Sequence, residues 1–128
     1  MLAQVSTCRV LVCDDQPEFR ALLRAVLDAE EDVEIVGESA DGEACVEQAA
    51  ELLPDVVLLD LNMPRMGGME ALPLLRERAP ESRVVVLTTA AASDSEAEAR
   101  SLGALGFVEK RGNVFDLPAQ IREQLRAA

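Results

Sequence analysis

Residues 56–64 read V-V-L-L-D-L-N-M-P: four apolar residues, then an aspartate, then a segment that ends in proline. Continuous apolar runs of this length, rich in β-branched residues, are typical of strands buried on both faces of a sheet. Val10–Cys13 and Val84–Leu87 are two further runs of the same kind. The sequence therefore predicts a sheet with buried strands at these three places.

Shorter apolar runs and helical stripes surround these strands. Val33–Val36 and Leu105–Val108 are more mixed in composition, as expected of strands nearer the edges of a sheet. Apolar residues at helical spacing predict helices within residues 19–27, 46–53, 69–79, 93–102 and 114–125. Strands that alternate with helices indicate a parallel sheet with right-handed crossovers. We therefore predict the α/β class, with a doubly wound, five-stranded parallel sheet and five helices.

Two helices have ambiguous features in the sequence. Pro73 lacks an amide hydrogen and would lose the bond to Met69 unless it lies near the first turn of its helix. The last helix can begin after Asn113 or after Asp116, since either residue can cap a helix, and Pro118 favours the later start. Both starts remain open at this point.

Length and composition limit the classes of protein. The chain has 128 residues and no linker-like or repeated segment, so we expect one domain at residues 1–128 with a core of about 9–126. A formal net charge of −12 repels nucleic-acid phosphates, and 2% aromatic residues are too few for base stacking. No apolar run approaches the ~20 residues that cross a bilayer, and the N-terminus lacks a secretory signal. We expect a cytoplasmic protein without a membrane partner.

Two residue types limit the chemistry. The chain contains no histidine, which excludes a histidine general base, a Ser-His-Asp triad and the usual zinc-ligand sets. Cys8, Cys13 and Cys45 are an odd number of cysteines without a C-x-x-C pair, so no disulfide framework is expected. We interpret them as small apolar residues without chemistry.

Polar side chains stand at the carboxyl ends of the predicted strands. Asp14 and Asp15 follow the first strand, Asp60 the third, Thr88 the fourth and Lys110 the fifth. Ligands of open parallel sheets bind in the crevice outside these ends. Three carboxylates gathered there repel one another unless a cation lies among them, and Mg²⁺ prefers such oxygen ligands. With Lys110 as a second positive charge, the set suits phosphoryl transfer onto an aspartate.

The order and spacing of these motifs resemble the receiver domain of two-component response regulators, over Arg9 to Leu125. The motifs are V-C-D-D, L-L-D-L-N-M-P at Leu58–Pro64, V-V-L-T ending at Thr88 and G-F-V-E-K ending at Lys110. The D-D-Q-P and V-E-I-V-G-E-S-A-D-G segments look most like receivers of NarL/LuxR-type regulators. The resemblance implies a flavodoxin-like, CheY-like fold with strand order 2-1-3-4-5.

The resemblance also implies a phosphorylation site with bound Mg²⁺. Asp60 would be the phosphoacceptor, and a histidine on a sensor histidine kinase would be the donor. Asp15 and Asp60 would ligate Mg²⁺ directly, Asp14 would act through water, and Asn62 would contribute its backbone carbonyl. The chain would then be no enzyme, apart from Mg²⁺-dependent self-phosphorylation from a phosphodonor and self-dephosphorylation.

The response to phosphorylation is implied in the same way. Thr88 would be the switch hydroxyl that is pulled toward the phosphoryl group, and Lys110 would pair with that group. Phe107 would turn inward as the region from the fourth strand to the last helix repacks. A phenylalanine at this position excludes a switch that uses a phenolic hydroxyl.

The sequence departs from the family's usual pattern at four places. Lys110 is followed by arginine where many receivers have proline, which favours a trans peptide bond. Gly67 replaces a common aspartate and is expected to loosen its loop.

The other two departures concern Ala90 and the fourth helix. Ala90 is small, so we expect water to reach the phosphoryl group and self-dephosphorylation to be appreciable. Glu96 and Ala97 stand where large apolar residues are usual, so we expect a mobile fourth helix that becomes ordered on phosphorylation or partner binding.

Two other functions remain as alternatives to a phosphorylation-controlled signalling switch. A Mg²⁺-dependent aspartyl phosphatase of the haloacid-dehalogenase kind also uses an aspartate after a strand, but its second acid would stand at Asn62. A phosphorylation-independent, receiver-like interaction module would normally lack one of the five polar residues, and here all five are present. Taken singly, Thr88 and Lys110 are ordinary residues, and the aspartates could merely solvate loops or cap helices.

The output of such a switch is open from the sequence. NarL/LuxR-type regulators usually carry a helix-turn-helix domain after the receiver, and this chain ends at Ala128. We expect the receiver part of a transcription regulator that binds DNA only through a domain absent from this chain, with a stand-alone receiver as the alternative. A homodimer could form through the first and last helices or through the face from the fourth helix to the last.

Overall fold

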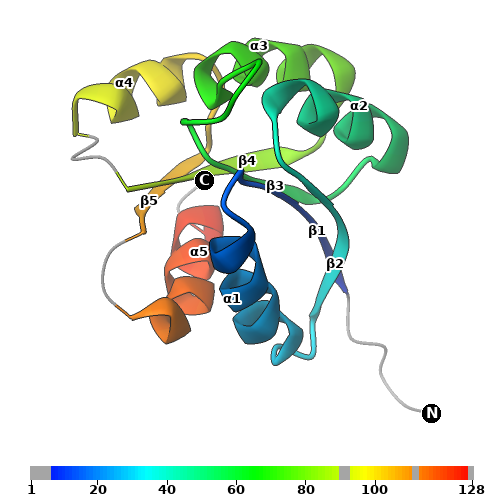
Figure 1. Cartoon of the computed structure of the whole chain (residues 1–128), viewed down its shortest axis with the longest axis vertical. Coiled ribbons are helices and arrows are strands. Elements are labelled where there is room, and N and C mark those ends of the chain that lie inside the picture. Colours follow the sequence, from blue (N-terminus) through cyan, green and yellow to red (C-terminus); the bar gives the residue numbers. More distant parts are fainter. Residues whose placement is uncertain (1–6, 90–92, 111–112, 127–128) are drawn as a thin grey trace.

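A computed structural model describes residues 7–89, 93–110 and 113–126 of the chain (Figure 1). Strands and helices alternate along it, as the apolar pattern predicts. The elements are β1 (Cys8–Cys13), α1 (Pro17–Asp28), β2 (Val33–Ser39), α2 (Gly42–Leu52), β3 (Val56–Leu59), α3 (Gly68–Arg78), β4 (Arg83–Thr88), α4 (Ser93–Ser101), β5 (Gly106–Glu109), the 3₁₀ turn η1 (Val114–Asp116) and α5 (Leu117–Arg126).

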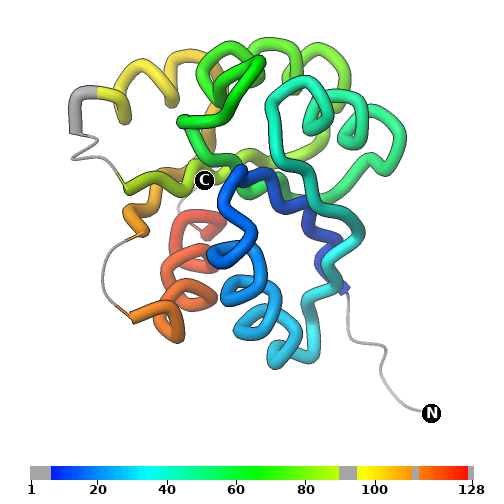
Figure 2. The backbone as a smooth tube through the Cα atoms, in the orientation of Figure 1, coloured from blue at the N-terminus to red at the C-terminus, as the bar shows by residue number. Residues whose placement is uncertain are grey.

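The five strands form one parallel sheet in the order β2-β1-β3-β4-β5. Helices α1 and α5 cover one face, and α2, α3 and α4 cover the other (Figures 1 and 2). The strand order reverses between β1 and β3, since β2 pairs with one edge of β1 and β3 with the other. The predicted class, strand order and helix positions are therefore confirmed.

Alternate residues of each central strand enter two separate apolar cores. Val57 and Leu59 of β3 pack with α2 and α3, whereas Val56 and Leu58 pack with α1 and α5. All four are buried. A strand covered on both faces requires apolar residues at every position, which is why β3 reads as an unbroken apolar run.

Several helix ends follow the signals in the sequence. Asp41 caps α2, because its side chain accepts a hydrogen bond from the Ala44 amide at 2.8 Å. Pro73 is the sixth residue of α3, so it lies beyond the first turn and the helix continues without a bond to Met69. Asn113 caps η1 through the Phe115 amide at 2.9 Å, and α5 begins after Asp116. Both candidate starts are therefore used, and the later one begins the α-helix.

The expectation of three unpaired cysteines is wrong for two of them. Cys13, the last residue of β1, and Cys45, in the first turns of α2, form a disulfide with their Cα atoms 5.9 Å apart. The two cysteines are 32 residues apart in the chain, so the sequence gives no indication that they are close. They meet because α2 packs against β1 in the folded chain. Cys8 is free and half-buried.

Among the residues that the structure describes, no helix is long and apolar enough to span a bilayer.

Candidate functional site

Three aspartates gather where the strand order reverses. Leu59 of β3 pairs with Cys13 of β1, and the amide of Asp60 donates to the Cys13 carbonyl at 2.9 Å. Asp14 and Asp60 therefore follow adjacent strand ends. One carboxylate oxygen from each of Asp14, Asp15 and Asp60 lies within 4.8 Å of the others. Oxygen donors at this separation suit a hard divalent cation.

Lys110 brings a positive charge to the same place from the end of β5. Its amide donates to the Thr88 carbonyl at 2.8 Å, which fixes the start of the loop after β5 beside β4. Its Nζ forms an ion pair with Asp14 Oδ2 and lies 3.4 Å from Asp60 Oδ2. The side chains of Lys110, Asp14 and Asp60 are 2%, 3% and 5% exposed. A buried cation therefore compensates two buried carboxylates.

The carboxyl of Asp60 is easier to protonate than an ordinary aspartate. Burial raises its pKa most, and the nearby Asp14 charge adds to that effect. The Asn62 amide, which donates to Asp60 Oδ1 at 3.2 Å, and the Lys110 ammonium act in the opposite direction. Added positive charge would therefore favour the ionised, nucleophilic form of the Asp60 carboxylate.

Asp14 and Asp15 differ in exposure although they are adjacent. Asp14 is buried, with Oδ1 accepting from the Gln16 amide at 2.8 Å and Oδ2 paired with Lys110. Asp15 is exposed, and Asn62, beyond Asp60, is exposed as well. The cluster thus has a buried side formed by Asp14 and an open side formed by Asp15 and Asn62.

Of the two predicted switch residues, Thr88 lies next to Lys110, and Phe107, in β5, lies three residues before Lys110. Thr88 ends β4, is fully buried and is adjacent to Lys110 through its backbone. Phe107 of β5 pairs with Val86 of β4. Its half-buried side chain packs against the core beneath α2, α3 and α4. Two predictions concern residues outside those that the structure describes: access of water past Ala90, and the trans peptide bond between Lys110 and Arg111.

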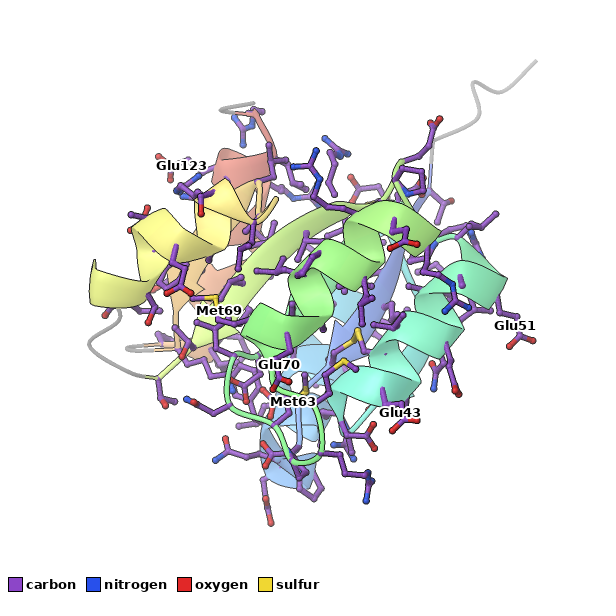
Figure 3. The ribbon with its side chains drawn as sticks, turned by 90° about the horizontal axis from the view of Figure 1, so that it is seen from above. Glu43, Glu51, Met63, Met69, Glu70 and Glu123 are labelled. Carbon is purple, nitrogen blue, oxygen red and sulfur yellow. A yellow bond between two sulfur atoms is a disulfide. The ribbon has the colours of Figure 1, made fainter. Side chains whose placement is uncertain are left out.

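The loop from Asp60 to Gly67 is held to its surroundings at several points. Gly68 allows this path: a Cβ there would lie 2.4 Å from the Asp60 carbonyl oxygen. Its amide donates to the Leu61 carbonyl at 3.0 Å. Gly67, which precedes α3, has φ −75° and an amide that donates to Glu70 Oε1 at 3.4 Å. Figure 3 shows Met63 and Glu70 at this end of α3.

Helix α2 also fixes this loop. Arg65 Nη2 lies 2.6 Å from Asp41 Oδ2, and the Gly42 amide donates to the Met66 carbonyl at 2.9 Å. Hydrogen bonds from Ala44 and Arg65 hold the pKa of Asp41 below its usual range.

Two residues near the site were not recognised from the sequence. Phe19 of α1 places its ring 4.3 Å from Lys110 Nζ, where it covers the ammonium. Arg20 donates to the Asp14 carbonyl and, at 3.1 Å, to Glu38 of β2. In the sequence, the apolar stripe identifies Phe19 as a core residue. The one feature that could have linked Phe19 and Arg20 to the site is their position at the start of α1, shortly after Asp14 and Asp15.

The polar fourth helix forms over Ser93–Ser101, one residue shorter than predicted. Among its described side chains, Ala99 is buried, while Glu96 and Arg100 form an ion pair at 2.9 Å. Arg100 also donates to the Leu105 carbonyl at 2.7 Å and to Gln124 Oε1 at 3.1 Å. Gln124 of α5 accepts from the Phe107 amide at 3.2 Å. Helices α4 and α5 are thus joined across β5.

The response regulator receiver domain family matches residues 10–122, and the chain belongs to this family. It is 38% identical over 108 residues to the nitrate/nitrite response regulator protein NarL of Escherichia coli, covering 84% of this chain and 50% of that protein. The signal receiver domain of NarL from Mycobacterium tuberculosis is 30% identical, with a TM-score of 0.87, and the match covers 96% of this chain and 99% of that one. The NarL/LuxR-type resemblance is therefore confirmed.

A second kind of relative shares the receiver. A protein-glutamate methylesterase/protein-glutamine glutaminase of Caldanaerobacter subterraneus is 42% identical over 111 residues, covering 85% of this chain and 30% of that protein. The chain therefore spans half or less of the length of these two curated relatives. What is shared is the receiver domain of two-component systems.

Proposed function

We propose that this chain is a phosphorylation-controlled signalling switch whose phosphoacceptor is Asp60. The observation that carries this proposal is the buried Lys110 ammonium beside Asp14 and Asp60, with the exposed Asp15 carboxylate on the open side. Phosphoryl transfer depends mainly on positioning and on neutralising negative charge. A carboxylate, a fixed cation and further oxygen ligands in one crevice supply those needs.

The donor set fits Mg²⁺, because carboxylate oxygens that lie within 4.8 Å of one another suit its preference for oxygen. Asp15, Asp60 and the Asn62 backbone carbonyl would hold the ion directly, and Asp14 would hold it through water. Bound there, Mg²⁺ would neutralise negative charge on the phosphoryl oxygens.

The chemical step uses Asp60 and Lys110. A carboxylate oxygen of Asp60 forms a bond to phosphorus while the N–P bond of the kinase phosphohistidine breaks, and the electron pair of that bond returns to the imidazole. The Lys110 ammonium pairs with the phosphoryl oxygens. In self-dephosphorylation, water attacks the phosphorus and the P–O bond to Asp60 breaks. Beyond these two reactions we assign the chain no enzymatic activity.

The signal then passes from the site toward α4 and α5. The new negative charge attracts the Thr88 hydroxyl at the end of β4, and Phe107 turns inward. The region from β4 to α5 repacks, including the contacts of Arg100 and Gln124 across β5.

We assign the chain to the receiver part of a cytoplasmic transcription regulator, activated by a sensor histidine kinase. The NarL relatives support this assignment, and DNA contact would belong to a domain outside this chain. A homodimer is compatible with the fold. The complete set of polar residues argues against a phosphorylation-independent module, and Asn62 argues against a haloacid-dehalogenase-like phosphatase.

Intact mass spectrometry tests the proposal directly. We expect incubation with acetyl phosphate and Mg²⁺ to add one phosphoryl group to the chain and to Asp28→Asn, a control at an exposed aspartate of α1. The adduct should be absent from Asp60→Asn and from samples with a chelator. If the chain is folded and no condition produces an adduct, the phosphorylation-independent module is favoured.

A further inference from the structure

The disulfide between Cys13 and Cys45 lies inside an apolar core. The two side chains are 1% and 0% exposed and pack within an apolar cluster that includes Leu59 and Leu72. The Ser39 hydroxyl donates to Cys13 Sγ at 3.2 Å. Two thiols would fill this space as small apolar side chains. The packing is therefore compatible with two thiols as well as with the disulfide.

One end of the disulfide is part of the acidic site. The Cys13 carbonyl accepts the Asp60 amide at 2.9 Å, and the next residue is Asp14. A constraint on the Cys13 backbone is therefore a constraint on both buried aspartates. Cys8 lies at the opposite end of β1, five residues and about 16 Å along the strand, so it cannot replace either partner within one molecule.

The other end of the disulfide is in the helix that holds the loop after Asp60. Cys45 lies in α2, one turn beyond the start of that helix. At that start, Asp41 pairs with Arg65, and the Gly42 amide donates to the Met66 carbonyl. The bond therefore joins the strand that carries Asp14 to the helix that anchors the loop after Asp60.

We propose that Cys13 and Cys45 are a reversible oxidation site through which a peroxide changes the metal affinity of the acidic cluster. Because both thiols are buried in the folded chain, the reaction starts from a local opening that exposes one of them to solvent. That thiol loses its proton, the thiolate attacks hydrogen peroxide, the O–O bond breaks, and a sulfenic acid and hydroxide form; the hydroxide takes up the proton to give water. The second thiol then attacks the sulfenic sulfur, the S–O bond breaks, and a second water leaves. Two thiols thus lose two electrons to the peroxide, and a dithiol reductant restores them.

The covalent part of the proposal is tested in a Cys8→Ser variant, which removes intermolecular pairing through Cys8. After hydrogen peroxide, unfolding and alkylation, intact mass should show a loss of two hydrogens and no alkyl group, while dithiothreitol should restore two alkylated thiols. The oxidised form should melt about 10 °C higher. Cys8→Ser/Cys45→Ala should show neither change. Two alkylated thiols after peroxide would overturn the proposal.

The coupling to the site is measured by titrating Mg²⁺ into both forms in a calorimeter. We expect at least twofold tighter binding by the disulfide form, because Asp14 and the loop after Asp60 are already restrained before binding. Equal affinities would overturn the coupling. This part rests on the proposed function, and acetyl phosphate labelling of the same samples separates the two: an Asp60 adduct with equal Mg²⁺ affinities contradicts the coupling alone.

Discussion

The ammonium of Lys110 is paired with Asp14 and lies 3.4 Å from Asp60, so one buried cation from β5 connects the acidic residues that follow β1 and β3. Three strands thereby contribute to one electrostatic unit. Its members are separated by up to 96 residues in the chain. The stability of this unit and its chemistry are coupled, because the same charges perform both roles.

Replacing Lys110 should therefore affect both properties. Without the ammonium, two buried carboxylates lose their compensating charge, and we expect Lys110→Met to lower the free energy of unfolding by about 3 kcal/mol. Added Mg²⁺ should restore part of this loss. Urea unfolding with and without Mg²⁺ measures both effects; an unchanged free energy would mean that Lys110 contributes no net stability.

The exposed Asp15 should affect the metal more than the fold. We expect Asp15→Asn to weaken Mg²⁺ binding roughly tenfold or more, while the free energy of unfolding changes by no more than about 0.5 kcal/mol. Glu18→Gln, at another exposed acid in the first turn of α1, provides the matched control. Equal weakening by both variants in calorimetry would show a general charge effect in place of ligation.

The raised pKa of Asp60 predicts a pH dependence. The folded state then binds the Asp60 proton more tightly than the unfolded state, so this group favours folding at low pH, and that contribution is lost as pH rises through the folded pKa. Without Mg²⁺, Asp60→Asn should therefore be more stable than the parent chain at pH 7. The difference should shrink below the ordinary aspartate pKa of about 3.9. Urea midpoints across this range measure it, and a pH-independent difference would contradict the prediction.

The adjacent glycines before α3 should respond differently to a methyl group. A Cβ at Gly68 would lie 2.4 Å from the Asp60 carbonyl oxygen, so Gly68→Ala should lower the free energy of unfolding by about 2 kcal/mol and reduce labelling of Asp60. A Cβ at Gly67 would be 3.1 Å from the Leu61 carbonyl oxygen, with an ordinary φ, so Gly67→Ala should be tolerated much better. If both variants lower the free energy of unfolding equally, the close approach of Gly68 to the Asp60 carbonyl does not explain the loss.

The small side chain of Ala90 predicts a short-lived phosphoryl group. We expect Ala90→Arg to lengthen the phosphoryl half-life severalfold, because a large side chain would hinder attacking water. Loss of the mass adduct with time after removal of acetyl phosphate measures the half-life. An unchanged half-life would remove this explanation.

The sheet and its acidic edge were predictable because they depend on local patterns. An apolar run such as Val56–Leu59 identifies a buried strand, and parallel strands place their carboxyl ends at one edge. Asp14, Asp60 and Lys110 could therefore be assigned to one crevice before their distances were known. The start of α5 was ambiguous because Asn113 and Asp116 are both good capping residues, and the chain uses Asn113 for η1.

The contacts between elements could not be predicted in the same way. The Cys13–Cys45 disulfide and the position of Phe19 over Lys110 depend on how α2 and α1 are rotated against the sheet. A helical stripe identifies which face is buried, but not which atoms of the sheet that face meets. The ion pair between Arg65 and Asp41 likewise depends on the path of a loop, which has no periodic pattern.

The contacts of Gln124 and Arg100 have a consequence for self-association. β5 is an edge strand of the sheet, and the backbone groups of such strands can pair with a strand from another molecule and begin aggregation. The side chain of Gln124 accepts from the Phe107 amide, and Arg100 donates to the carbonyl of Leu105, just before β5. These two side chains thereby occupy backbone groups through which a strand of another molecule would pair with this edge.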